Sequence, residues 1–134
     1  MKMLLNLASL ILIAGIFFTC SDEPGTEADK IGIAAECTLD ESCSQDDATL
    51  TCQTEFKGGY CGIEGCTAHS DCPEGSICVA QDGVNYCMRT CVDKPECNLH
   101  RTLDNESNCS GSFNPVTDVE GNVKVCIPPS SGVK

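Results

Sequence analysis

Cysteine is the residue type through which this chain can do chemistry, since 13 of its 134 residues are cysteines. A thiol can form a structural disulfide, bind a metal ion or catalyse disulfide exchange. Catalytic disulfides and zinc ribbons use cysteines separated by two residues. The closest pair here, Cys87 and Cys91, has three residues between its members. The spacing therefore favours structural disulfides, and we expect no redox centre, no metal site and no cofactor.

Twelve of the cysteines fall into three successive groups of four. Five residues separate the first and second cysteines of every group. The second gap is eight, five or eleven residues, and the third is eight, eight or sixteen. A motif repeated in this way predicts three small modules, each closed by two disulfides. The groups are Cys37, Cys43, Cys52 and Cys61; Cys66, Cys72, Cys78 and Cys87; and Cys91, Cys97, Cys109 and Cys126.

Four cysteines allow three pairings, and the sequence alone leaves the choice open. We predict first-to-third and second-to-fourth disulfides, because a hairpin that ends at the fourth cysteine suits two crossing bonds. Nested bonds, first-to-fourth and second-to-third, are the alternative. The predicted pairs are Cys37–Cys52, Cys43–Cys61, Cys66–Cys78, Cys72–Cys87, Cys91–Cys109 and Cys97–Cys126.

Each module carries the pattern of a short β-hairpin. In the second group, apolar stretches at 77–80 and 84–87 flank a glycine-containing turn at 81–83, which is a hairpin signal. Equivalent turns at 57–59 and 120–122 predict hairpins of 50–56 with 60–61, and of 116–119 with 123–126. Outside the apolar start of the chain, only 99–105 suggests a helical turn.

An apolar residue precedes the fourth cysteine of each group. These residues are Tyr60, Tyr86 and Val125, and we expect them to pack over a disulfide. Stacking of the two tyrosines on a carbohydrate is the alternative. Because other apolar residues are sparse, the disulfides must substitute for much of a core.

The predicted fold is therefore small and disulfide-rich, with three tandem modules of short β-hairpins and little helix apart from the signal segment. We predict a signal peptide (1–19), a disordered acidic tether (20–36), module 1 (37–63), module 2 (64–88), module 3 (89–127) and a disordered tail (128–134).

The start of the chain has the layout of a secretory signal. Lys2 is followed by a mostly apolar run at 3–18 and then by polar residues. This run is somewhat shorter than the about 20 residues that a membrane span needs, although an uncleaved anchor is the alternative. The signal predicts an exported protein in an oxidising compartment.

Cys20 stands apart from the twelve, directly after the apolar run. The sequence Phe17-Phe18-Thr19-Cys20 resembles the lipobox of bacterial lipoproteins. The resemblance implies that the Cys20 thiol carries a diacylglycerol, that the signal is cut before it, and that the protein is anchored at the outer membrane or cell surface. Lipidation would use the odd thiol and leave twelve to pair.

The charge of the chain limits its partners. The formal net charge is −12, and from Cys20 onward it is −13, because Lys2 is the one charged residue before Cys20. So acidic a chain is not expected to bind nucleic acid. We expect an extracellular protein or glycan as its partner.

The spacing of the central cysteines resembles known scaffolds. Cys66-x5-Cys72-x5-Cys78-x8-Cys87-x3-Cys91-x5-Cys97 is similar to the amino-terminal cysteine-rich domain of Dickkopf proteins, and more loosely to colipase and EGF-like scaffolds. With the stretch 71–75 (Asp-Cys-Pro-Glu-Gly), it also resembles cysteine-rich repeats of exported myxobacterial proteins. The resemblance implies a fold type rather than a partner.

We therefore predict a non-catalytic binding or structural display module, with the long loop between Cys109 and Cys126 as the first place to look for a binding site. His69 and His100 lie in polar loops, without a nucleophile beside them, so no enzyme is expected. One alternative is a secreted protease inhibitor that presents Arg89 from a constrained loop.

The other alternative is a calcium-stabilised module, because several loops carry carboxylates. Solvated acidic loops are the competing interpretation, since no EF-hand spacing is present. The acidic sets are Asp40-Glu41, Asp46-Asp47, Asp71 with Glu74, and Asp118 with Glu120.

Overall fold

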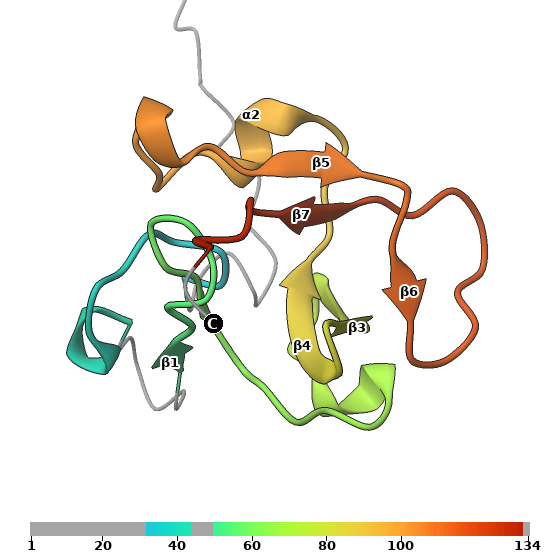
Figure 1. Ribbon diagram of the computed structural model, residues 1–134. Coiled ribbons are helices and arrows are strands. Elements are labelled where there is room, and N and C mark those ends of the chain that lie inside the picture. The colour runs from blue at the N-terminus through green and yellow to red at the C-terminus, as the bar shows by residue number, and fades with distance from the viewer. Residues whose placement is uncertain (1–31, 44–49, 133–134) are drawn as a thin grey trace, which may run out of the picture.

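The structure is a computed structural model that describes residues 32–43 and 50–132. The signal segment, Cys20, the first part of the tether and the Asp46-Asp47 pair lie outside the described residues. Within the described part, no helix is long and apolar enough to cross a membrane. The elements (Figure 1) are η1 (Asp40–Ser42), β1 (Thr51–Cys52), β2 (Cys61–Gly62), η2 (His69–Asp71), β3 (Ser76–Gln81), β4 (Val84–Arg89), α2 (Lys94–Cys97), η3 (Leu103–Asn105), β5 (Asn108–Ser110), β6 (Asn114–Pro115) and β7 (Val125–Ile127).

The same unit recurs in all three modules. The third and fourth cysteines of a group lie directly opposite each other on an antiparallel strand pair, and their side chains therefore project from the same face. Both disulfides of a module leave from that face. The opposed pairs are Cys52 with Cys61 on β1 and β2, Cys78 with Cys87 on β3 and β4, and Cys109 with Cys126 on β5 and β7.

Six disulfides join the cysteines in the first-to-third and second-to-fourth pattern that the sequence analysis expects. In every module, one sulfur of one disulfide lies within 4.8 Å of both sulfurs of the other, so the two bonds cross side by side. The fold is small, disulfide-rich and built from short antiparallel strand pairs, as predicted. The bonds are Cys37–Cys52, Cys43–Cys61, Cys66–Cys78, Cys72–Cys87, Cys91–Cys109 and Cys97–Cys126, with Cα–Cα distances of 5.3–6.0 Å.

Module 2 contains the longest hairpin, formed by β3 and β4. Its two-residue turn consists of Asp82 and Gly83, whose φ angles are 51° and 86°. Positive φ at both positions is what a tight type I′ turn requires, and Asp-Gly is a favoured sequence for it. The turn therefore fixes the register that places Cys78 opposite Cys87.

The third hairpin is not the one that the sequence predicts. β7 pairs with β5, and the expected partner segment 116–119 forms no strand. β6 instead adds to module 2, where Pro115 lies opposite Val79 on β3. Val116 explains the difference, because its N–H donates to the Cys78 carbonyl (3.1 Å) and its side chain packs against the module 2 disulfides.

The three modules share one main core, and a smaller cluster of Cys66, Cys78 and Cys87 lies within module 2. Tyr60, Tyr86 and Val125, each next to a fourth cysteine, are 0%, 5% and 0% exposed and belong to the same cluster. Phe56 lies between the two tyrosines, with ring centroids 5.7 Å from Tyr60 and 5.2 Å from Tyr86. Their burial supports the packing role that the sequence analysis favours over carbohydrate stacking.

Both ends of the described chain pack against this body, where the sequence predicts disorder up to residue 36 and from residue 128. Ile33 and Ala34 are each only 3% exposed and join the core. At the other end, Ser130 bridges to Phe56, and the Ser131 N–H donates to the Glu55 carbonyl, 2.8 Å away. Figure 1 shows this return of the carboxyl-terminal segment to the region of module 1. Buried apolar side chains hold the first segment in place, and backbone pairing holds the second. Neither contact can be predicted from the composition of these segments.

Arg101 of module 3 joins its module to module 1. Its half-buried guanidinium donates to the carbonyl oxygens of Ala34 (3.2 Å), Lys57 (2.7 Å), Gly59 (2.9 Å) and Asn105 (2.7 Å). A planar group with five donors can reach four carbonyls at once, and an ammonium group cannot.

We therefore expect Arg101→Lys to lower the free energy of unfolding by about 2 kcal/mol, because it leaves half-buried carbonyls without a donor. Urea unfolding with the disulfides intact measures this change. The matched control is Lys94→Met, which removes the exposed ion pair with Glu106 and is expected to cost about 0.5 kcal/mol or less. Equal effects of the two substitutions would contradict the role given to Arg101.

Glu36 holds the start of the described chain against module 3. Its carboxylate accepts hydrogen bonds from the Thr102 N–H (2.8 Å), the Thr102 hydroxyl (2.9 Å) and the Asn105 amide (2.6 Å). The bond from the Thr102 N–H is the main cause that lowers the pKa of Glu36 below its ordinary value, 4.5. The charged form is therefore favoured in the folded state.

When the pKa of a carboxyl group is lower in the folded than in the unfolded state, the group stabilises the fold at pH values above its unfolded-state pKa. This contribution is lost as the pH falls through the folded-state pKa. Glu36→Gln should therefore destabilise the fold most at neutral pH, and the difference from the parent should shrink below pH 4.5. Urea midpoints measured along a pH series test this expectation. Glu120→Gln, at an exposed position, serves as the control. A Glu36→Gln effect that does not vary with pH would refute the linkage.

Candidate functional site

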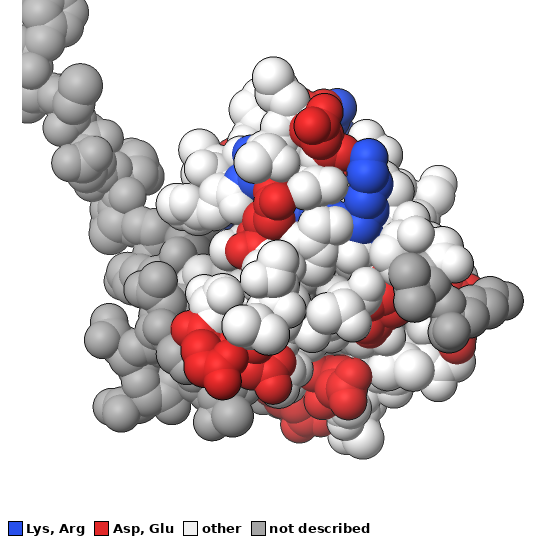
Figure 2. Space-filling model, turned by 60° about the vertical axis from the view of Figure 1, so that its left-hand side comes forward, with Lys and Arg blue, Asp and Glu red and all other residues white. Residues whose placement is uncertain are grey.

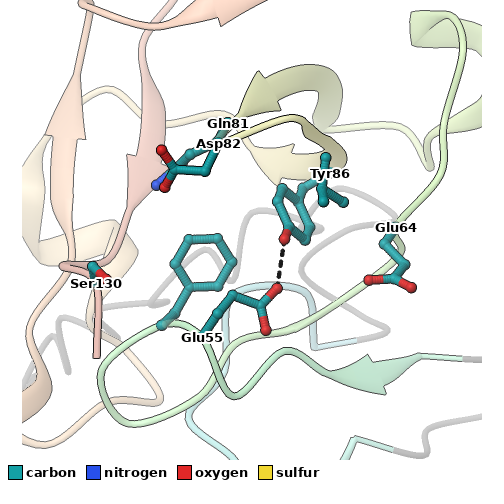
Figure 3. Close-up of a pocket in the computed structure, with 8 residues that line it drawn as sticks. Glu55, Glu64, Gln81, Asp82, Tyr86 and Ser130 are labelled. Carbon is teal, nitrogen blue, oxygen red and sulfur yellow. Dashed lines mark hydrogen bonds between the residues drawn. The ribbon is translucent and has the colours of Figure 1, made fainter. Parts of the chain in front are cut away.

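A hollow of about 610 Å³ opens where module 1, the link to module 2, the β3–β4 turn and the carboxyl-terminal segment meet (Figure 3). Its size lies within the roughly 300–1,000 Å³ range of small-ligand pockets. Side chains from four separate parts of the chain line it: Glu55, Phe56, Glu64, Gln81, Asp82, Val84, Tyr86 and Ser130.

Backbone pairing fixes the walls of the hollow. Glu64 forms a bridge with Tyr86 of β4, which brings the link between modules alongside the hairpin. Phe56 forms a second bridge with Ser130, which closes the opposite wall. The site is therefore set by main-chain contacts and does not depend on flexible side chains alone.

The hollow combines an aromatic floor with carboxylates. The Phe56 and Tyr86 rings meet edge to face, with centroids 5.2 Å apart and planes at 70°. Tyr86 donates its hydroxyl to the Glu55 carboxylate at 2.6 Å. Figure 3 shows Glu64 and Asp82 on opposite sides of Tyr86. Among the described residues that line this hollow, none is a lysine or an arginine.

The negative charge of this site affects the pKa of the Tyr86 phenol. Burial is the largest cause that raises the pKa of the Tyr86 phenol, and its hydrogen bond to Glu55 is the next. The negative charges of Glu55, Glu64 and Asp82 raise it further, since a second negative charge is disfavoured beside them. The three carboxylates thus act on one point inside the hollow.

The molecule as a whole is also acidic, with a formal net charge of −12. Figure 2 shows one face of it, where Lys and Arg lie in the upper part, and Asp and Glu lie both there and across the lower part. A body with this charge attracts cationic groups over distances of about 8–10 Å at moderate ionic strength.

No known protein family, no curated protein and no solved structure matches this chain. Its function is therefore inferred from the chemistry of its own residues.

Arg89, the residue named for protease inhibition, is the last residue of β4. It is half-buried, its backbone N–H donates to the Tyr60 hydroxyl at 3.0 Å, and its guanidinium donates to the Glu96 carbonyl. A residue held in a strand by these contacts is unlike the protruding extended loop that a protease cleft accepts.

Two of the carboxylates named for calcium, Asp40 and Asp71, serve local structure. Asp40 accepts the Cys52 N–H at 2.8 Å. Asp71 accepts three hydrogen bonds from Thr67 and Ala68, which cap η2 and lower its pKa. Within residues 32–43 and 50–132, three ligand atoms come within 4.8 Å of one another only at cysteine sulfurs already in disulfides.

His69 has a structural role that the sequence did not suggest. Its Nδ1 accepts the Cys78 N–H (3.1 Å), which leaves Nε2 to donate to the Thr117 carbonyl (3.0 Å). The ring thus ties the long loop of module 3 to module 2. His100, by contrast, is exposed.

The long loop between Cys109 and Cys126 was the expected binding region. Part of it is β6, which completes the sheet of module 2, and the loop encloses a smaller hollow of about 380 Å³ beside Phe113 and Asp118. The larger hollow at the module junction was missed, because Glu55, Glu64 and Asp82 belong to different segments. The one sequence signal for it is Tyr86, for which the sequence favours packing over a disulfide and leaves carbohydrate stacking as the alternative.

The two tyrosines give a spectroscopic test of this environment, since the chain has two tyrosines and no tryptophan. Burial raises the pKa of Tyr60 as well as that of Tyr86 above the ordinary value of 10.0. At pH 10 the native protein should therefore show far less phenolate absorbance than the urea-unfolded chain. A folded pKa that is raised also means that stability falls as the pH rises above 10. Equal titration curves for the folded and unfolded chains would contradict the buried environment.

Proposed function

We propose that this protein is an exported lipoprotein whose folded part is a non-catalytic binding module. In this proposal a lipid on Cys20 anchors it to a bacterial outer membrane or cell surface, and its partner is an extracellular protein or glycan. The observation that carries the proposal is the pairing of all twelve cysteines after residue 36, which leaves Cys20 as the odd thiol. Structural disulfides persist in oxidising compartments outside the cytosol.

Binding suits the folded body better than catalysis does. Both ring nitrogens of His69 are engaged by backbone groups, so this ring is not placed to act as a base. The best-formed hollow instead offers carboxylates and an aromatic floor on a rigid frame. Preorganised surfaces of this kind lose little conformational entropy on binding. The similarity of the central cysteine spacing to Dickkopf and EGF-like scaffolds suits the same role.

The proposal predicts the mass of the protein purified from its native membrane without reduction. The mature chain should lack residues 1–19, carry added lipid and have lost 12 hydrogens to six disulfides. Intact mass spectrometry measures all three changes at once. Cys20→Ser is the matched control, and it should carry no lipid while keeping its six disulfides. Thiols that react with an alkylating agent among the twelve, or a full-length chain without lipid, would refute the proposal.

A further inference from the structure

We propose that the hollow at the module junction binds a single basic side chain, lysine or arginine, of a partner polypeptide. The proposal rests on the binding role proposed above and names the site and the chemistry of the partner. The supporting observation is a concave site whose described lining residues include three carboxylates and two aromatic rings but no lysine or arginine.

The shape of the hollow matches the two parts of such a side chain. Phe56, Tyr86 and Val84 offer apolar surface for the aliphatic stem, and Val84 is 39% exposed although it is a large apolar residue. Glu55, Glu64 and Asp82 line the same hollow, and their carboxylates would attract the charged end. Long basic side chains commonly bury the stem and keep the charged head among polar groups.

The charges of the hollow are not all neutralised by the fold. Glu55 accepts a neutral hydroxyl, that of Tyr86, which leaves its negative charge in place. Glu64 and Asp82 are exposed, and among the described residues their carboxylates form no ion pair. A cation held by several carboxylates and near an aromatic ring gains from both interactions. A neutral or anionic ligand would leave these charges uncompensated.

A polypeptide is favoured over a free cation because of where the hollow lies. It opens at the surface beside the Asp82–Gly83 turn, in a chain whose formal net charge is −12. A basic segment could place one side chain in the hollow while its other charges meet acidic side chains elsewhere on the surface. The negative charge of the protein would raise the association rate of the partner, and the hollow would fix which residue of the partner segment binds there.

Titration of the oxidised full-length chain, ¹⁵N-labelled and in neutral detergent micelles, with short peptides tests the proposal. The probes are acetyl-Gly-Gly-Lys-Gly-Gly-amide, its arginine counterpart and its norleucine counterpart, which keeps the stem without the charge. The basic peptides should shift the amide resonances of the residues that line the hollow, and the norleucine peptide should not. Shifts scattered over the acidic surface, equal binding of the norleucine peptide or no shifts at all would overturn the proposal.

A pair of matched variants separates the hollow from general charge attraction. Glu64→Gln with Asp82→Asn removes two carboxylates of the hollow, and asparagine retains the tolerance for positive φ that the turn needs. Asp118→Asn with Glu120→Gln removes the same charge from exposed positions elsewhere. The first variant should bind the lysine peptide about tenfold more weakly, and the second less than about twofold. Equal losses would overturn the proposal.

The intact mass of the same samples distinguishes failure of the basic-side-chain site from failure of the exported disulfide scaffold. Six disulfides together with failure of the titration would refute the basic-side-chain site and leave the exported module standing. Unpaired thiols among the twelve cysteines would instead refute the exported scaffold itself.

Discussion

The opposition of two cysteines across an antiparallel strand pair is the constraint on which the rest of this structure depends. Because opposed side chains share a face, the third and fourth cysteines of each group direct both disulfides to one side of their strands. The neighbouring residue in the strand then points to the other side. That neighbour is Tyr86 in β4 and Val125 in β7, and both meet Tyr60, which directly precedes β2, in one core. The two kinds of residue thus have different roles. The disulfides close each module, and the apolar neighbours join the modules to one another.

This division also explains how a chain with four phenylalanines, two tyrosines and no tryptophan builds an interior. No single module has enough apolar surface to fold around, but three modules that each contribute at least three buried residues do. Polar contacts then complete the joints, as with the Arg101 guanidinium that reaches the Lys57 and Gly59 carbonyls in module 1. The packing of the modules also forms the junction hollow, which lies where modules 1 and 2 meet the carboxyl-terminal segment.

The sequence predicted what local spacing determines. The cysteine groups, the low helix content and the hairpin around Asp82–Gly83 all follow from patterns within a single cysteine group, and each appears in the structure. The pairing of β6 with β3 did not follow, because it joins residues more than 30 positions apart and Asn114–Pro115 is an unusual strand sequence. The Arg101 contacts were hidden for a different reason. Their acceptors are backbone carbonyls, which every residue carries and no sequence pattern marks.

The candidate site was invisible for the same kind of reason. Glu55 and Asp82 stand 27 positions apart, and they converge only because the bridges of Phe56 with Ser130 and of Glu64 with Tyr86 draw their segments together. Each carboxylate alone is typical of a solvated loop. Only the tertiary contacts turn three such residues into one concave, negative surface.

The return of residues 129–131 to module 1 has a consequence for the order of folding. The disulfides of module 1 join cysteines between positions 37 and 61 and can close without any later segment. The partners of the Lys57 N–H, the Glu55 carbonyl and the Phe56 backbone, however, come from 129–131. The edge of module 1 therefore stays open until this segment, almost 70 positions later in the chain, has packed against it.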